Sequence, residues 1–122
     1  DISMAKVYGI HEVELCPGVT GQALEKYFVE ELQPQPFYPG WKLQLVKADR
    51  GERAGKYAVL IEIESVEARD RIAPSGESLS DEARAVEAEF PESVNAAWNK
   101  WGTYMTTSPG VDTIFSDYIA VV

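Results

Sequence analysis

The order in which extended and helical patterns follow one another constrains this chain more than any other feature. Segments rich in β-branched and aromatic residues predict strands over 6–15, 41–48, 56–64 and 113–122. Apolar residues at helical spacing predict one helix after the first strand and a longer one after the third. The order βαββαβ predicts two right-handed crossovers, which place four antiparallel strands in one sheet with both helices on one face.

Capping and turn residues set the ends of these segments. Thr20 is expected to cap the first helix, which runs to Gln33 before a proline-rich loop over 34–40. Ser65 is expected to cap a short helix that stops at Pro74 and Gly76. The longer helix starts after Ser78 or Ser80, bends near Pro91 and runs toward Met105, with Ser108-Pro109-Gly110 separating it from the last strand.

Alternation along the strands gives the two faces of the sheet different characters. Val7, His11 and Val13 share one face of the first strand, which is expected to point toward the helices. The segment 57–63 is the most apolar in the chain and is placed centrally in the sheet. The opposite face, with Tyr8, Ile10, Ala58 and Leu60, is too apolar for water, which predicts a homodimer that covers it.

Length and composition exclude several classes of protein. The 122 residues fit one domain, here 4–122, because Asp1-Ile2-Ser3 precede Met4, the natural start that we expect. A net charge of −9 argues against nucleic acid as a partner, and no apolar run is long enough to span a membrane. A single cysteine, Cys16, fits the reducing cytoplasm. No metal-binding or nucleotide-binding motif occurs, so neither a metal nor a cofactor is expected.

Three segments resemble the dimeric α+β barrel superfamily, a ferredoxin-like group. They are Leu15-Cys16-Pro17-Gly18 before the first helix, the hairpin 47–53 and the stretch 63–70. The group contains antibiotic-biosynthesis monooxygenases, haem-degrading monooxygenases, muconolactone isomerases and stress-responsive barrel proteins, and the chain is most similar to its small uncharacterised bacterial members. The resemblance covers most of the chain. It implies a ferredoxin-like fold, a dimer and a ligand cleft between sheet and helices, without a fixed reaction.

His11, the only histidine, is the first candidate for a catalytic or ligand-binding residue. Its strand face points toward the expected cleft, and an imidazole with an ordinary pKa of about 6.5 can act as a general base or as a haem ligand. The alternative is a structural histidine that is hydrogen-bonded to a neighbour.

Aromatic residues are the remaining candidates for ligand contact. Trp98 and Trp101 lie three residues apart on the second helix and, with Tyr104 and with Tyr27 of the first helix, are expected to line the cleft for a flat, apolar ligand. The same spacing is what a helix needs to pack on a sheet, so core packing is the alternative.

Acidic residues within strands offer a third kind of candidate. Glu12 and Glu62, if on one face of neighbouring strands, would raise each other's pKa, and Asp117 lies in the last strand. The alternative places them at the dimer seam or bonded to Lys42, Lys47 or Tyr8. The hairpin over 49–55, which mixes arginine and acidic residues, is interpreted as a solvated turn.

Three functions are consistent with these features. The first is a small-molecule-binding dimer without chemistry. The second is a cofactor-independent monooxygenase or isomerase, in which His11 or a strand acid removes a proton from an activated carbon of an aromatic or polyketide-like substrate. The third is a structural or interaction module without a ligand. A cavity between His11 and Trp98 too small for anything beyond water would exclude the first two.

Overall fold

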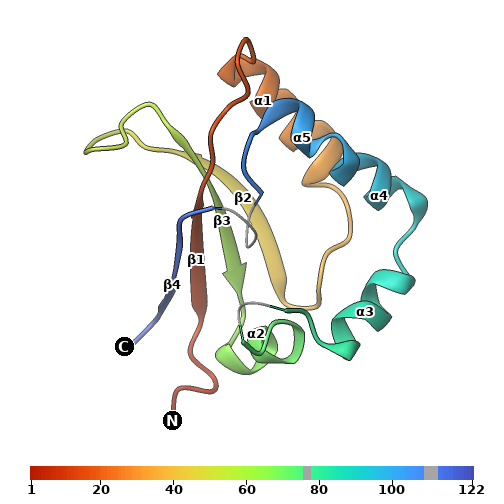
Figure 1. Ribbon diagram of the computed structural model, residues 1–122. Coiled ribbons are helices and arrows are strands. Elements are labelled where there is room, and N and C mark those ends of the chain that lie inside the picture. Colours follow the sequence, from red (N-terminus) through yellow and green to blue (C-terminus); the bar gives the residue numbers. More distant parts are fainter. Residues whose placement is uncertain (76–77, 109–112) are drawn as a thin grey trace.

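The computed structural model describes residues 1–75, 78–108 and 113–122, and Figure 1 shows its elements. The strands are β1 (Val7–Glu12), β2 (Trp41–Lys47), β3 (Tyr57–Ile63) and β4 (Phe115–Ile119). The helices are α1 (Gly21–Tyr27), η1 (Phe28–Leu32), α2 (Val66–Ile72), α3 (Asp81–Ala88), α4 (Glu92–Asn99) and α5 (Trp101–Tyr104). The predicted turn residues Gly76, Pro109 and Gly110 lie outside the described residues.

The strands form one antiparallel sheet in the order β2-β3-β1-β4. In the register, Val7 lies opposite Ile63 of β3 and Ile119 of β4, and β3 also pairs with β2 along its whole length. The predicted four-stranded antiparallel sheet is therefore confirmed, with β3 inside it as expected. The class is α+β, because the strands are antiparallel and the helices pack on the sheet.

The helices lie on one side of the sheet, and the core lies between them (Figure 1). Val7, Val59 and Ile63 of the strands are buried there against Leu24 and Phe28 of the first helical segment. On the opposite face Ile10 is 38% exposed. Alternation along β1 thus sorts its side chains between a covered and an open face, as predicted.

Each of the two long helices predicted from the sequence is divided into shorter helices in the structure. Thr20 caps the first, but the chain changes at Phe28 to π-helical turns in η1. The second is divided into α3, α4 and α5: Pro91 caps α4, since it lacks the amide a continuous helix needs, and a further break falls at Lys100. The last strand is also shorter than predicted, ending at Ile119. Among the described residues, no helix combines the length and apolar character required to cross a membrane.

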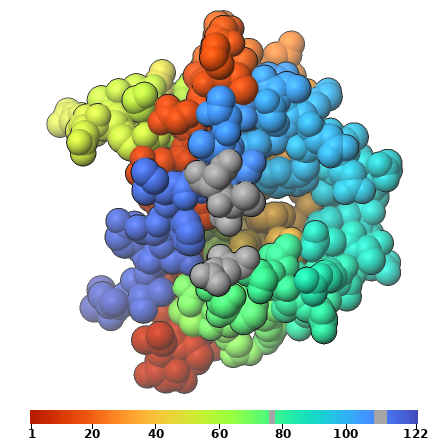
Figure 2. All heavy atoms as spheres, viewed as in Figure 1, coloured from red at the N-terminus to blue at the C-terminus, as the bar shows by residue number. Residues whose placement is uncertain are grey.

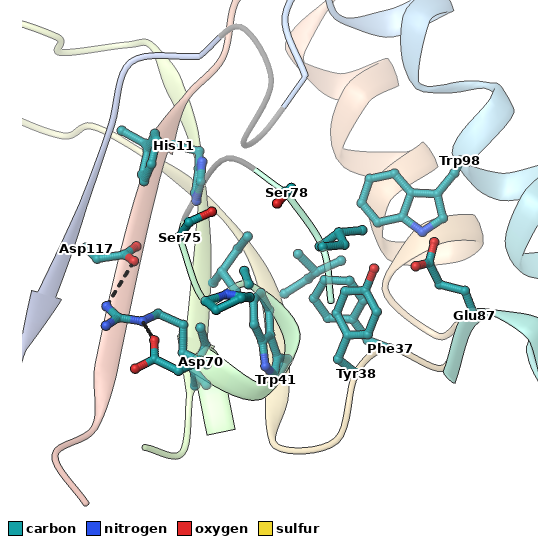
Figure 3. Close-up of a pocket in the computed structure, with 18 of the residues that line it drawn as sticks. His11, Phe37, Tyr38, Trp41, Asp70, Ser75, Ser78, Glu87, Trp98 and Asp117 are labelled. Atoms are coloured by element: carbon teal, nitrogen blue, oxygen red, sulfur yellow. Dashed lines mark hydrogen bonds and ion pairs between the residues drawn. The ribbon is translucent and has the colours of Figure 1, made fainter. Parts of the chain in front are cut away.

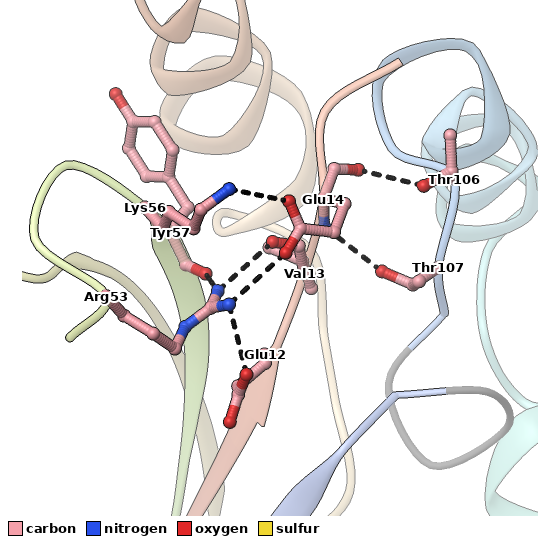
Figure 4. Close-up of polar contacts among 8 residues, drawn as sticks. All are labelled: Glu12, Val13, Glu14, Arg53, Lys56, Tyr57, Thr106 and Thr107. Atoms are coloured by element: carbon pink, nitrogen blue, oxygen red, sulfur yellow. Dashed lines mark hydrogen bonds and ion pairs between the residues drawn. The ribbon is translucent and has the colours of Figure 1, made fainter.

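Arg53 ties the β2–β3 hairpin to the end of β1 (Figure 4). Its guanidinium lies 3.0 Å from the Glu12 carboxylate and 3.2 Å from that of Glu14, and it donates to the carbonyl of Tyr57 at 2.9 Å. The Glu14 carbonyl in turn accepts from the amide of Thr106 at 2.9 Å. The other residues of 49–55 are exposed, as predicted for a solvated turn, and Arg53 is the exception, because charge-assisted bonds fix its side chain.

Candidate functional site

A cavity of about 790 Å³ lies between the covered face of the sheet and the helices. Figure 2 shows the molecule hollowed between the α4 side and α2, and Figure 3 shows the lining side chains. Aliphatic residues from three elements and a loop supply part of the wall: Leu43, Ile61, Ile63, Leu79 and Val94. The volume falls within the range of roughly 300–1,000 Å³ that is typical of ligand pockets.

One end of the cavity is aromatic. Phe37 and Tyr38 follow the prolines that end the first helical segment, and Trp41 begins β2. The Phe37 ring lies 5.8 Å from Trp41, edge to face, and 6.3 Å from Trp98 of α4. Tyr38 also approaches Phe90, with ring centroids 6.2 Å apart. The loop over 34–40 therefore contributes rings that join Trp41 of β2 and Trp98 of α4 in one aromatic wall.

The opposite end is polar and centred on Arg69 of α2. Its guanidinium lies 3.1 Å from a carboxylate oxygen of Asp70 and 3.3 Å from one of Asp117 on β4. Asp117 lies opposite Gly9 in the sheet register, and a Cβ at position 9 would be only 2.7 Å from its carboxylate. Glycine at position 9 thus leaves the space that the Asp117 carboxylate occupies.

His11 lies at this polar end, where Figure 3 shows it on the same side as Asp117. Only 6% of the residue is exposed, and its ring stacks on Phe115 of β4 with centroids 4.8 Å apart and planes 7° apart. Its Nδ1 is 3.4 Å from the hydroxyl of Thr113. Burial lowers the pKa of His11 below its ordinary value, and the negative charge of Asp117 opposes that shift. The imidazole is therefore neutral near pH 7.

The polar atoms at the aromatic end differ in whether they form a hydrogen bond within the protein. Burial together with the neighbouring Glu87, which accepts a hydrogen bond from it, raises the pKa of the Tyr38 hydroxyl to about 12. The indole Nε1 of Trp41 is buried and has no hydrogen-bond partner among the described residues. A wall that is mainly apolar thus also carries a carboxylate and an unused donor.

Of the five residues predicted to bind a ligand, the structure brings His11 and Trp98 to this cavity. Tyr27 is 1% exposed, donates from its hydroxyl to the carbonyl of Ala97 at 2.6 Å and stacks on Tyr104 with centroids 4.3 Å apart. Trp101 is 4% exposed and donates from Nε1 to the carbonyl of Thr107 at 2.6 Å. None of Tyr27, Trp101 and Tyr104 is part of the cavity lining, and all three pack with the core instead.

The structure does not couple the two strand acids to each other, and it agrees with the alternative that each is bonded to a neighbour. Glu12 and Glu62 share the open face, but each has its own cation: Lys6 lies 2.6 Å from Glu62, and Arg53 lies 3.0 Å from Glu12. The hydrogen bond from Lys6 lowers the pKa of Glu62 rather than raising it. Of the expected lysines, Lys42 lies opposite Glu62 in the sheet register, and its charge also lowers the pKa of Glu62. The third acid, Asp117, is the one that reaches the cavity.

Most of the lining was not identified from the sequence. Phe37, Tyr38 and Trp41 form a dense aromatic run among prolines, and such a run in a loop that precedes a strand was a usable signal. The contact between Arg69 and Asp117 joins residues 48 apart in the chain, and no local pattern marks it.

No group of three or more His, Cys, Asp or Glu side chains is placed to hold a metal ion within residues 1–75, 78–108 and 113–122. Neither a comparison with models of protein families nor a search of curated protein sequences finds a match to this chain. Function must therefore be inferred from the chemistry of the cavity.

Proposed function

We propose that the protein binds a small, mainly apolar molecule in the cavity between the sheet and the helices. The observation that carries this proposal is the cavity itself, about 790 Å³ in volume, with aromatic rings at one end and His11 and Arg69 at the other. A ligand there would lay its flat body against Phe37 and Trp98 and be oriented by the polar groups. An interaction module with a filled core would not need this space.

The wider architecture that we propose is a ferredoxin-like domain of the dimeric α+β barrel type, working in the cytoplasm. The chain order β1-α1-β2-β3-α2-β4, with α3 to α5 inserted before β4, and the sheet order β2-β3-β1-β4 support it. Helices on a single face, as in Figure 1, support it further. The resemblance of the three segments noted above points the same way.

The chain's three tryptophans provide a direct test of binding. Trp41 and Trp98 line the cavity, whereas Trp101 lies outside it. A library of small aromatic compounds is screened by ligand-detected NMR, and each hit is titrated into two variants. In Trp101→Phe the fluorescence comes from the two cavity tryptophans, and in the double variant W41F/W98F it comes from Trp101 alone.

A hit bound in the cavity should change the fluorescence of Trp101→Phe with saturation and leave that of the double variant almost unaltered. The two variants are matched controls for each other, because both replace indole by phenyl. Hits that affect both equally, or a library without any saturable hit, would remove the proposal.

We also propose that a second copy of the chain covers the open face of the sheet. Ile10 and Leu60 lie opposite each other on adjacent strands there, and Tyr118 of β4 is 59% exposed on the same face. The ion pairs Lys6–Glu62 and Arg53–Glu12 flank this centre, so a twofold contact over Ile10 and Leu60 would bury no unpaired charge.

Sedimentation velocity tests this second copy. The wild type should sediment as a dimer, and Leu60→Glu as a monomer, since a carboxylate would be buried at the seam without a partner. Gln22→Glu, at an exposed position of α1 on the helix side of the sheet, is the control for added charge. A monomeric wild type at micromolar concentration excludes the dimer.

A second candidate function is proton removal by His11, the first step expected of a cofactor-independent oxygenase or isomerase. The observation that favours it is a neutral imidazole at the cavity wall, held by Phe115 and near Thr113. A ligand with an acidic carbon should exchange that C–H for deuterium in D₂O, the proton passing to His11 and back to solvent. NMR should show this exchange lost in His11→Asn while binding persists; unchanged exchange would exclude the role.

A further inference from the structure

The charges that line the cavity do not balance. Its ionisable side chains near neutral pH are Arg69 with one positive charge and Asp70, Glu87 and Asp117 with one negative charge each, which leaves an excess of two negative charges. His11 adds none, because burial keeps it neutral. The residues 76–77 and 109–112, which the structure does not describe, contain no lysine or arginine and so bring no compensating cation.

Arg69 is already occupied. Asp70 at 3.1 Å and Asp117 at 3.3 Å accept from two different nitrogens of its guanidinium. An anionic ligand at this end would displace one of these carboxylates or lie beside both of them. Like charges at such distances repel, so the polar end is poorly suited to a carboxylate or phosphate group.

Glu87 is the carboxylate without a countercharge. No lysine or arginine of the described residues forms a salt bridge with it, and its neighbour is the hydroxyl of Tyr38, within the aromatic group that includes Trp41 and Phe90. Figure 3 shows Glu87 on the same side of the cavity as Trp98, opposite His11. A carboxylate at the edge of several aromatic faces is a chemical setting that attracts an ammonium group, through charge and through cation–π contact.

We infer that the ligand of this cavity is an organic cation, an amine or quaternary ammonium on an aromatic or apolar body, whose charged group lies between Glu87 and the rings of Tyr38 and Trp98. This inference rests on the proposed binding function and names the ligand class of that site. The apolar body would extend along the wall formed by Phe37 and Ile61 toward His11.

Three probes of nearly equal size test the charge preference: 2-naphthylmethylammonium, 2-naphthylmethanol and 2-naphthoate, titrated by calorimetry. The ammonium is expected to bind about fivefold or more tightly than the alcohol, and the naphthoate most weakly. The N,N,N-trimethyl form of the ammonium should keep most of this advantage, since its charge faces the rings without donating a hydrogen bond. Raising the salt concentration to about 0.5 M should reduce the advantage, because Glu87 lies at the exposed rim.

Two isosteric variants locate the charge. Glu87→Gln should lower the affinity for the ammonium much more than the affinity for the alcohol, and so remove most of the preference for ammonium. Glu89→Gln makes the same change two residues further on, where the side chain is exposed and does not line the cavity, and should leave the preference intact. Equal effects of the two variants, or equal binding of ammonium and naphthoate by the wild type, overturn the inference.

The screen of small aromatic compounds separates this inference from the binding function on which it rests. The library contains cations, neutral compounds and anions in equal numbers. Hits that change cavity tryptophan fluorescence and are mainly cationic support both. If the hits that change cavity tryptophan fluorescence are mainly neutral or anionic, the binding function is supported and the charge preference is overturned. A library without hits overturns both proposals.

Discussion

Two groups of aromatic side chains meet in this protein and have opposite surroundings. In the packed group, Tyr27 and Trp101 are buried in the core and Tyr104 is half-buried against it, whereas the cavity group, Phe37, Tyr38, Trp41 and Trp98, lines the cavity. The groups touch at Trp98 and Trp101, whose ring centroids are 5.6 Å apart. Trp98 and Trp101 are therefore neighbours in the sequence and in space, but one lines the cavity and the other is buried in the core.

The polar atoms of the two groups explain the difference. In the packed group, the Tyr27 hydroxyl and the Trp101 indole donate to the carbonyls of Ala97 and Thr107, so neither of these donors is left for a ligand. In the cavity group, Trp41 Nε1 has no partner among the described residues. A buried donor that has no partner and lies beside a cavity, such as Trp41 Nε1, is available to a ligand.

The largest expected effect is on stability, from removing one ring of each group. Trp101→Ala should lower the free energy of unfolding by about 3–5 kcal/mol, because the buried indole leaves a void. Trp98→Ala should cost only about 1–2 kcal/mol, because one side of this ring already faces the cavity. Urea denaturation of both variants measures the two values. Equal losses would show that Trp98 is a core residue and that the two groups are not distinct.

The next effect concerns single hydroxyl groups. Tyr27→Phe should cost about 1–2 kcal/mol, since it removes a buried hydrogen bond and leaves the acceptor at Ala97 without it. Tyr38→Phe should cost less than about 0.5 kcal/mol, because its partner Glu87 is exposed and can be solvated by water. The same denaturation experiment compares them. A larger loss for Tyr38→Phe would indicate that its hydroxyl holds the aromatic end of the cavity together.

Features that depend on near neighbours in the chain were predictable from the sequence. Periodicity gave the strands and the helical regions, and the caps Thr20 and Ser65 are where their side chains were expected to act. Alternation along β1 placed His11 on the covered face, where it is buried. Pro91 marked the start of α4 because the missing amide acts locally.

Features that depend on distant neighbours were not predictable in this way. Spacing on a helix indicates that Trp98 and Trp101 share a face, but the break at Lys100 and the acceptor at Thr107 decide which ring is enclosed. Glu12 and Glu62 do lie on one face, the condition that the sequence left open, and the cations that pair with them are Arg53 and Lys6, which the strand pattern does not indicate. Which side chains become ion-pair or hydrogen-bond partners across the chain is decided only when the fold brings them together.

The smallest expected effect concerns the dependence of stability on pH, and it tests the polar end of the cavity. Because burial lowers the pKa of His11 in the folded protein, the unfolded chain binds this proton more readily. Above pH 6.5, the ordinary pKa, His11 is neutral in both states and should not reduce the free energy of unfolding. That free energy should fall as the pH falls from 6.5 through the lower pKa of His11 in the folded protein. The carboxyl group of Glu14, whose pKa the hydrogen bond from Arg53 lowers, acts in a separate window: its contribution is present above the ordinary value of 4.5 and is lost at lower pH.

The two windows can be separated because the chain has a single histidine. The imidazole proton resonance of His11 should titrate below pH 6.5 in the folded protein. The variant His11→Asn should flatten the stability curve just below pH 6.5 and leave the fall below pH 4.5 unaltered. Asp117→Asn is the matching change at its neighbour: loss of that negative charge should lower the pKa of His11 further. A resonance that titrates above 6.5 would mean that His11 carries a positive charge in the cavity at neutral pH, and the excess of negative charge along the cavity would then be smaller than inferred above.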